Sequence, residues 1–138
     1  MPAASLSIPP LAEHVRTARL VAVAAARRAG LTEDIVDDVR LAVSEVVARA
    51  VLLHGSLGSD RDVDMVIRDD GHDFTVEVTG EPDPTSPTSH DRVAVAEHAG
   101  DGTGDGAVAL ALVHALVPQV EVGPGSVSLA WPLTAASV

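Results

Sequence analysis

Hydrophobic and polar residues recur along this chain with two different periods, which predict the type of each element. Residues 11–29 are rich in alanine, contain no glycine or proline, and end at Gly30, a residue that commonly follows a helix. Over residues 33–54, apolar side chains return every three or four positions in two stripes. We therefore predict two helices. Thr32 caps the second, which ends near Gly55 and packs on two neighbours because both stripes are apolar.

A period of two marks the strands. Residues 62–68 and 74–78 alternate apolar and polar side chains around an Asp-Asp-Gly turn, which predicts a β-hairpin. Residues 120–122 and 127–131 predict a second hairpin around a Gly-Pro-Gly turn. A third helix is expected over residues 107–116, because an apolar run there ends before a proline.

Two segments lack a clear period. Residues 1–10 contain three prolines and predict an irregular lead-in, with room for an edge strand at residues 6–8. Residues 79–105 are rich in proline, glycine and polar residues, with a short helix possible at 93–98. Loops of that length are usually functional or mobile.

The order of these elements predicts the fold class. Two helices, a hairpin, a long loop, a third helix and a second hairpin favour an α+β fold. We expect a two-layer α/β sandwich whose mixed, mostly antiparallel sheet carries the helices on one face. A length of 138 residues with 46% hydrophobic residues suits a single domain over residues 1–138.

Composition excludes several classes of function. The chain has 20 acidic and 9 basic residues, and every base is arginine. The absence of lysine excludes a Walker A lysine and Schiff-base chemistry. A net charge of -11 argues against nucleic-acid binding and suits a basic protein partner, although it would serve solubility equally well. The absence of cysteine excludes disulfides and thiolate metal sites.

The location expected from the sequence is cytoplasmic. No apolar run approaches the roughly 20 residues of a membrane-spanning helix. The first residues lack the basic start and the long apolar run of a signal peptide.

One motif resembles a known family. The segment Leu-Thr-Glu-Asp-Ile-Val-Asp-Asp-Val-Arg-Leu-Ala-Val-Ser-Glu at residues 31–45 is similar to the second-helix entry of the anti-sigma factor serine kinases, and its last five residues are the most specific part. Ala18-Arg19 and the final strand at 127–133 also fit. These kinases belong to the GHKL ATPase class, which they share with histidine kinase catalytic domains. A stand-alone histidine kinase domain fits this short chain less well.

The resemblance assigns roles to two residues of the second helix. In the family, a glutamate acts as base near the γ-phosphate, and an asparagine four residues later holds Mg²⁺. Glu45 matches the base, but Arg49 stands at the asparagine position. A guanidinium has no lone pair for a cation, so Arg49 cannot hold Mg²⁺. We expect Glu45 and Arg49 to form an ion pair across the metal position, or Arg49 to reach solvent instead. The family's next histidine would fall at Leu53, one residue before His54.

The second ATP-binding box also departs from the family. An aspartate that contacts adenine is expected where Gly80 stands, and the first glycine of the box is replaced by Pro82. Proline lacks an N–H and fixes φ, so it is a poor substitute for that glycine. Asp83 could contact adenine only from a shifted register.

The third box is altered as well. Its two glycines, which bring backbone amides to the phosphates at a helix start, correspond to Ala107 and Ala109. Gly104 and Gly106 lie just upstream and could compensate, or could simply belong to a flexible loop.

The resemblance therefore implies regulation without efficient catalysis. Phosphoryl transfer depends on positioned charges around a metal, and three boxes are damaged. We expect a protein that binds a sigma factor, an STAS-domain anti-anti-sigma factor, or both, possibly as a homodimer, with no ATP or Mg²⁺ unless the site is rescued. The alternative is an active or weak ATP-dependent serine kinase that phosphorylates an STAS-domain protein.

Other chemistry is less well supported by the sequence. Six histidines suggest a metal site, but none shows a His-x-x-x-His spacing, so we expect surface histidines. Ser44 has no histidine nearby in sequence, which argues against a hydrolase. Phe74 and Trp131, the only aromatic residues other than histidine, stand at strand positions and are expected in the core.

Overall fold

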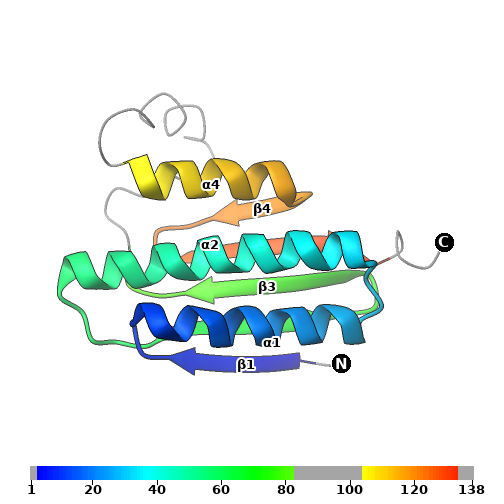
Figure 1. Ribbon diagram of the computed structural model, residues 1–138, viewed down its shortest axis with the longest axis horizontal. Coiled ribbons are helices and arrows are strands. Elements are labelled where there is room, and N and C mark those ends of the chain that lie inside the picture. Colours follow the sequence, from blue (N-terminus) through cyan, green and yellow to red (C-terminus); the bar gives the residue numbers. More distant parts are fainter. Residues whose placement is uncertain (1–2, 83–103, 134–138) are drawn as a thin grey trace.

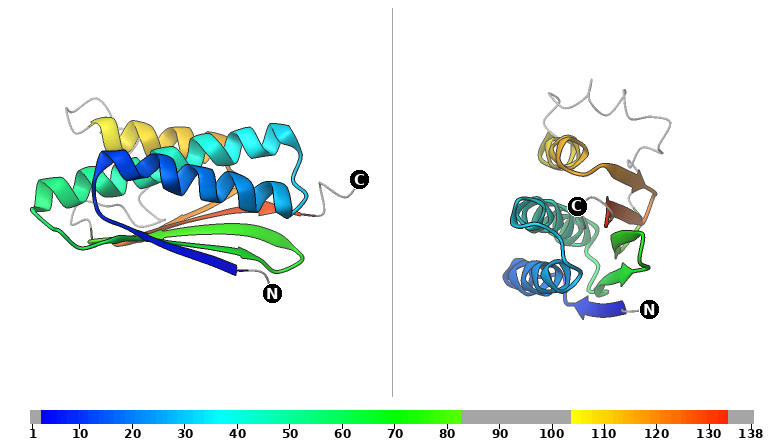
Figure 2. Two further views of the ribbon diagram at one scale, coloured as in Figure 1. Left: turned by 60° about the horizontal axis from the view of Figure 1, so that its bottom comes forward. Right: turned by 90° about the vertical axis from the view of Figure 1, so that its right-hand side faces the viewer.

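The computed structural model describes residues 3–82 and 104–133. Within these ranges, three α-helices lie side by side over one face of a five-stranded sheet, which gives the molecule two layers (Figures 1 and 2). The predicted α+β sandwich with its helices on one face is therefore confirmed.

The sheet is antiparallel at every junction. The strands are β1 (Ala3–Ile8), β2 (Val63–Asp69), β3 (Asp73–Thr79), β4 (Gln119–Val122) and β5 (Ser126–Pro132). Their order in the sheet is β1-β2-β3-β5-β4, and each of the four neighbouring pairs runs antiparallel. The described sheet therefore contains no parallel pair, although a mixed sheet was expected. Both predicted hairpins are present.

The beginning of the chain is more regular than the sequence predicted. Strand β1 pairs with β2 from Ala3 opposite Arg68 to Ile8 opposite Val63, and it forms one edge of the sheet. The expected irregular lead-in is therefore wrong for residues 3–8. The three prolines of this segment stand at its two sides, so they flank the strand and do not interrupt its pairing.

The helices begin and end close to their predicted bounds, with informative differences. They are η1 (Ala12–His14), a 3₁₀ turn, followed by α1 (Val15–Arg28), α2 (Glu33–Leu57) and α4 (Gly104–Leu116). Gly30 has φ +89°, as expected after a helix end. Thr32 caps α2, since its side-chain oxygen accepts a hydrogen bond from the Ile35 N–H at 3.4 Å.

Helix α2 does not end near Gly55 as predicted. It continues to Leu57 and ends at Gly58, which adopts the left-handed conformation with φ +67°. A glycine inside a helix costs only about 1 kcal/mol relative to alanine. The last turn buries His54, and the contacts described below hold it in place.

The core lies between the two layers, with α2 at its centre. Helix α2 contacts α1 on one side and α4 on the other, and it packs on β2 and β3 (Figure 1). Both predicted apolar stripes contribute buried residues. Phe74 and Trp131 are also buried, with ring centroids 6.2 Å apart. The buried residues of α2 are Val36, Val39, Ala42, Val43, Val46, Val47, Val51 and His54.

Candidate functional site

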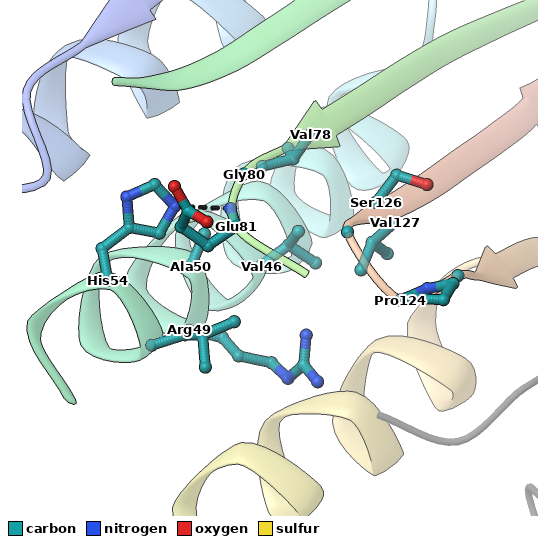
Figure 3. A pocket seen from close by; sticks show the side chains of 13 residues that line it. Val46, Arg49, Ala50, His54, Val78, Gly80, Glu81, Pro124, Ser126 and Val127 are labelled. Carbon is teal, nitrogen blue, oxygen red and sulfur yellow. Dashed lines mark hydrogen bonds between the residues drawn. The ribbon is translucent and has the colours of Figure 1, made fainter. Parts of the chain in front are cut away.

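Positions of the first two nucleotide boxes meet beside the second half of α2. The end of β3 and the start of β5 approach this half of the helix and enclose a small cavity (Figure 3). Arg49 and Gly80, two of the predicted positions, both line it. The lining residues are Val46, Arg49, Ala50, Leu53, His54, Val78, Gly80, Glu81 and residues 123–127.

Glu45 and Arg49 lie one turn apart on α2, and both are partly exposed. The ion pairs among the described residues do not include one between them, so the expected pairing is wrong. Arg49 instead extends its guanidinium away from α2 toward α4 (Figure 3). Arg49 therefore places a cationic group beside the cavity that it lines.

His54 is the only buried polar residue among the described residues, and the expectation of a surface histidine is wrong for it. Its Nε2 atom accepts a hydrogen bond from the Glu81 N–H at 2.8 Å. Because Nε2 accepts, the ring proton lies on Nδ1, which is 2.9 Å from the Arg61 carbonyl oxygen and donates to it. The neutral imidazole thus joins the last turn of α2 to the segments on both sides of the β2–β3 hairpin.

Gly80 is a glycine because the His54 ring lies against it. A Cβ atom added at Gly80 would stand 2.6 Å from His54 Nε2, closer than side chains normally approach. The Gly80 N–H also donates to the Gly125 carbonyl at 2.9 Å, and a Cβ at Gly125 would lie 3.1 Å from the Gly80 oxygen. The position of the family's adenine-binding aspartate therefore has no room for a side chain.

Three polar side chains near this junction were missed by the sequence reasoning. Ser59 donates to Glu81 Oε1 at 3.0 Å, and Arg61 Nη1 lies 3.8 Å from the same oxygen. The Arg61 N–H donates to the Ser59 hydroxyl oxygen at 3.2 Å. The sequence analysis singled out Pro82 because it replaces a glycine of the second box, but the sequence pattern gave no reason to single out Glu81. These contacts link the same two segments that the hydrogen bonds of His54 join.

The cavity itself is very small. Its volume is about 20 Å³, which is enough for about one water molecule. Sites for small molecules and cofactors commonly enclose roughly 300–1,000 Å³. The cavity enclosed by these residues is therefore far smaller than a nucleotide.

The third box lies in helix α4. Gly104 is the first residue of α4 and Gly106 lies in its first turn, so the helix begins three residues earlier than predicted. Ala107 and Ala109 therefore follow inside the helix, whereas the comparison with the family placed their positions at its start. Asp83 and the short helix expected over residues 93–98 lie outside the described residues.

The metal site and the serine considered in the sequence can both be checked against the described residues. Residues 3–82 and 104–133 contain no group of three or more histidine, aspartate or glutamate side chains placed to hold a metal ion. Ser44 donates its hydroxyl to the Arg40 carbonyl at 2.8 Å, a bond within its own helix. In the same ranges, no helix has the length and apolar character that crossing a bilayer requires.

Comparison with known proteins agrees with this architecture. The family described as histidine kinase-like ATPase domain matches residues 8–131. No curated protein matches the sequence. The matched range begins at the last residue of β1 and closes within β5, so it covers the described helices and strands β2, β3 and β4 in full.

Proposed function

Because the chain belongs to the family of histidine kinase-like ATPase domains, we propose that it uses this fold to bind regulatory proteins, in the manner of an anti-sigma factor, without efficient kinase activity. Its partner would be a sigma factor, an STAS-domain anti-anti-sigma factor, or both, which places its action in the cytoplasm. The observation that supports this proposal is the packing of the His54 ring against Gly80, where the family has an aspartate, beside a cavity of only about 20 Å³.

The chemistry of phosphoryl transfer supports the same conclusion. The transferred group needs a metal and positioned donors around its oxygens. Arg49 offers N–H donors but no lone pair, so it cannot replace an asparagine that ligates Mg²⁺. Glu45 then has no metal-bound phosphate beside it on which to act as a base.

The proposed loss of nucleotide binding can be tested by measuring the effect of Mg-ATP on the melting temperature. We expect Mg-ATP at millimolar concentration to leave the melting temperature unchanged. A ligand at a hundred times its dissociation constant would stabilise the fold by about 2.7 kcal/mol. A clear rise in melting temperature at micromolar ATP, with Mg²⁺ required, would overturn the proposal.

A single reversion should not restore the site. In calorimetry, Arg49→Asn should bind Mg-ATP no better than the natural chain, because Gly80 still leaves no room for an aspartate. Clear binding by this variant would mean that Arg49 alone blocks an otherwise competent pocket.

Partner binding needs its own test. Each candidate partner, a sigma factor and an STAS-domain protein, should be titrated separately against the chain at low and high salt. The net charge of -11 favours a partner with a basic surface, so the association rate should fall as salt increases. If neither class binds at any salt concentration, the regulatory proposal fails, although the nucleotide result still stands.

The second candidate function is a weak ATP-dependent serine kinase. Glu45 favours it, because this glutamate remains partly exposed on α2 at the position of the family's base. Transfer of labelled phosphate to an STAS-domain protein, lost in Glu45→Gln, would support this candidate over the first. We expect no transfer above background in either chain.

A further inference from the structure

A second cavity lies between the end of α1 and the sheet, where the last turn of α1 stands beside the start of β1 (Figure 1). The volume of this α1–β1 cavity is about 330 Å³, at the lower end of the roughly 300–1,000 Å³ that small-molecule sites enclose. Ala4 of β1 and Ala25 and Ala29 of α1 line it, and their short side chains leave the space open. Ile67 and Phe74 are buried and supply an apolar wall on the side of the sheet.

An acidic side chain interrupts the apolar face of β2 at this cavity. Val63, Met65 and Ile67 alternate on the buried face of the strand, and the same alternation places Asp69 on that face. Asp69 lines the cavity and is only half-buried. Its Oδ1 atom accepts a hydrogen bond from the Gly71 N–H at 2.9 Å, so the turn after β2 uses one carboxylate oxygen. The Oδ2 atom remains for a donor in the cavity.

Arg28 brings the opposite charge to the same cavity. It stands in the last turn of α1, is exposed, and belongs to the lining. The ion pairs among the described residues include neither Arg28 nor Asp69. A cation and an anion therefore border one apolar space without neutralising each other. Helix α1 ends at Ala29, and the negative end of its dipole also favours a positive group here.

We propose that the α1–β1 cavity binds a free apolar amino acid, such as leucine or phenylalanine. The ammonium group of the ligand bonds to Asp69 near the end of α1, and its carboxylate bonds to the guanidinium of Arg28, a geometry that arginine suits. The apolar side chain of the ligand lies against Ile67 and Phe74.

The charges of the site favour a zwitterion over a simple ion. A ligand with only negative charge is opposed by Asp69 and by the net charge of -11. A ligand with only positive charge is repelled by Arg28. None of these residues lines the small cavity beside His54, so the site is separate from the one described above. The proposal also does not depend on the proposed regulatory function.

The first test compares four small molecules on the natural chain by isothermal titration calorimetry. L-Leucine should bind saturably with one molecule per chain. L-Leucinamide lacks the carboxylate, N-acetyl-L-leucine lacks the ammonium group, and L-serine lacks the apolar side chain. Each of these three should bind at least about tenfold more weakly, because each loses one of the three proposed contacts.

Two charge variants assign the ends of the ligand. Asp69→Asn keeps a carbonyl oxygen for the Gly71 N–H but removes the negative charge, so it should abolish the preference for L-leucine over N-acetyl-L-leucine. Arg28→Gln should abolish the preference for L-leucine over L-leucinamide instead. General damage to the fold would weaken all compounds alike and would not separate the two preferences.

A pair of leucine variants tests the location of the site. Ala25 lines the cavity, whereas Ala24, its neighbour on α1, is exposed and does not line it. Ala25→Leu should fill the space and abolish binding, and Ala24→Leu should leave binding unchanged. Circular dichroism should show that both variants are folded. If Ala25→Leu does not fold, Ala4→Leu fills the same cavity from an exposed position on β1.

Three results would overturn the proposal. The first is the absence of saturable binding at millimolar L-leucine and L-phenylalanine. The second is equal binding of L-leucine, L-leucinamide and N-acetyl-L-leucine, which would show that the charged groups of the ligand are not recognised. The third is binding that survives both Ala25→Leu and Ala4→Leu, which would place the ligand elsewhere. These titrations involve neither nucleotide nor protein partner, so their failure leaves the proposed function untouched.

Discussion

The two halves of helix α2 have the same backbone conformation but are held in place by different interactions. The first half is capped by Thr32 and buries only apolar side chains, Val36, Val39, Ala42 and Val43. The second half also buries His54, whose two ring nitrogens bond to backbone groups of other segments. Apolar burial is non-directional and tolerates small shifts, whereas paired hydrogen bonds require fixed positions. We therefore expect substitutions in the second half of α2 to lower the stability of the protein more than substitutions in the first half.

The largest effect is expected from His54→Ala. The substitution leaves a cavity in place of a fully buried ring and deprives the Glu81 N–H and the Arg61 carbonyl of their partner. We expect a loss of about 4 kcal/mol in the free energy of unfolding, measured by urea denaturation. The matched change in the first half, Val43→Ala, should cost only about 2 kcal/mol. Equal losses of unfolding free energy in the two variants would contradict the proposed difference between the two halves of α2.

Gly80→Asp should follow in magnitude. It restores the family's residue, but the new Cβ would stand 2.6 Å from His54 Nε2, and two hydrogen bonds hold that ring in place. Overpacking of this kind costs about 3 kcal/mol. Combined with His54→Ala, the same substitution should cost clearly less than it does alone, because the clash has gone. Simple additivity of the two losses in a double-mutant cycle would contradict this account.

A smaller and opposite effect is expected at Gly55. A Cβ there meets nothing within 4 Å, and the residue lies inside α2. Gly55→Ala should raise the melting temperature, with a gain of about 0.5–1 kcal/mol. Gly58→Ala also enters open space, but its φ of +67° disfavours a side chain, so it should lower the melting temperature. If both substitutions shifted the melting temperature in the same direction, the helix would end at a different residue.

The smallest effect concerns the β2–β3 turn, far from His54. Backbone N–H groups of Asp73 and His72 donate to Asp70 and lower the pKa of its carboxyl group below the ordinary 3.8. A lowered pKa in the folded state gives stability that is present above the ordinary value and disappears as the pH falls through the folded value. Asp70→Ala should therefore lower the urea midpoint at neutral pH, with a difference that shrinks in acid. Asp60→Ala, at another exposed aspartate, serves as the control.

The sequence predicted the parts of the fold that depend on local periodicity. The two stripes of α2, the alternating hairpins and the cap at Thr32 follow from the spacing of apolar residues and from one polar side chain at a helix start. Strand β1 was only partly recognised, because a six-residue edge strand of small residues has a weak pattern. The end of α2 was misplaced because Gly55 looks like a stop, and only the contacts of His54 explain why the helix continues.

The candidate site was harder to predict. The comparison with a family identified Arg49 and Gly80 as departures from the ATP-binding boxes, and both line the cavity. It could not reveal that His54 fills the space beside Gly80, because the two residues are 26 positions apart and meet only through the fold. Glu81 was missed for the same reason. The assignment to the anti-sigma kinases within the wider family stays a prediction.

The single tryptophan gives the protein a built-in optical reporter. Trp131 is 2% exposed beside Phe74, and its indole N–H has no hydrogen-bond partner among the described residues. It lies five residues along β5 from Ser126 at the small cavity, a distance of about 17 Å at about 3.4 Å per residue. Its emission should therefore shift to the red when the core opens to water and change little when a molecule occupies the cavity. Unlabelled fluorescence can thus separate unfolding from ligand binding in one sample.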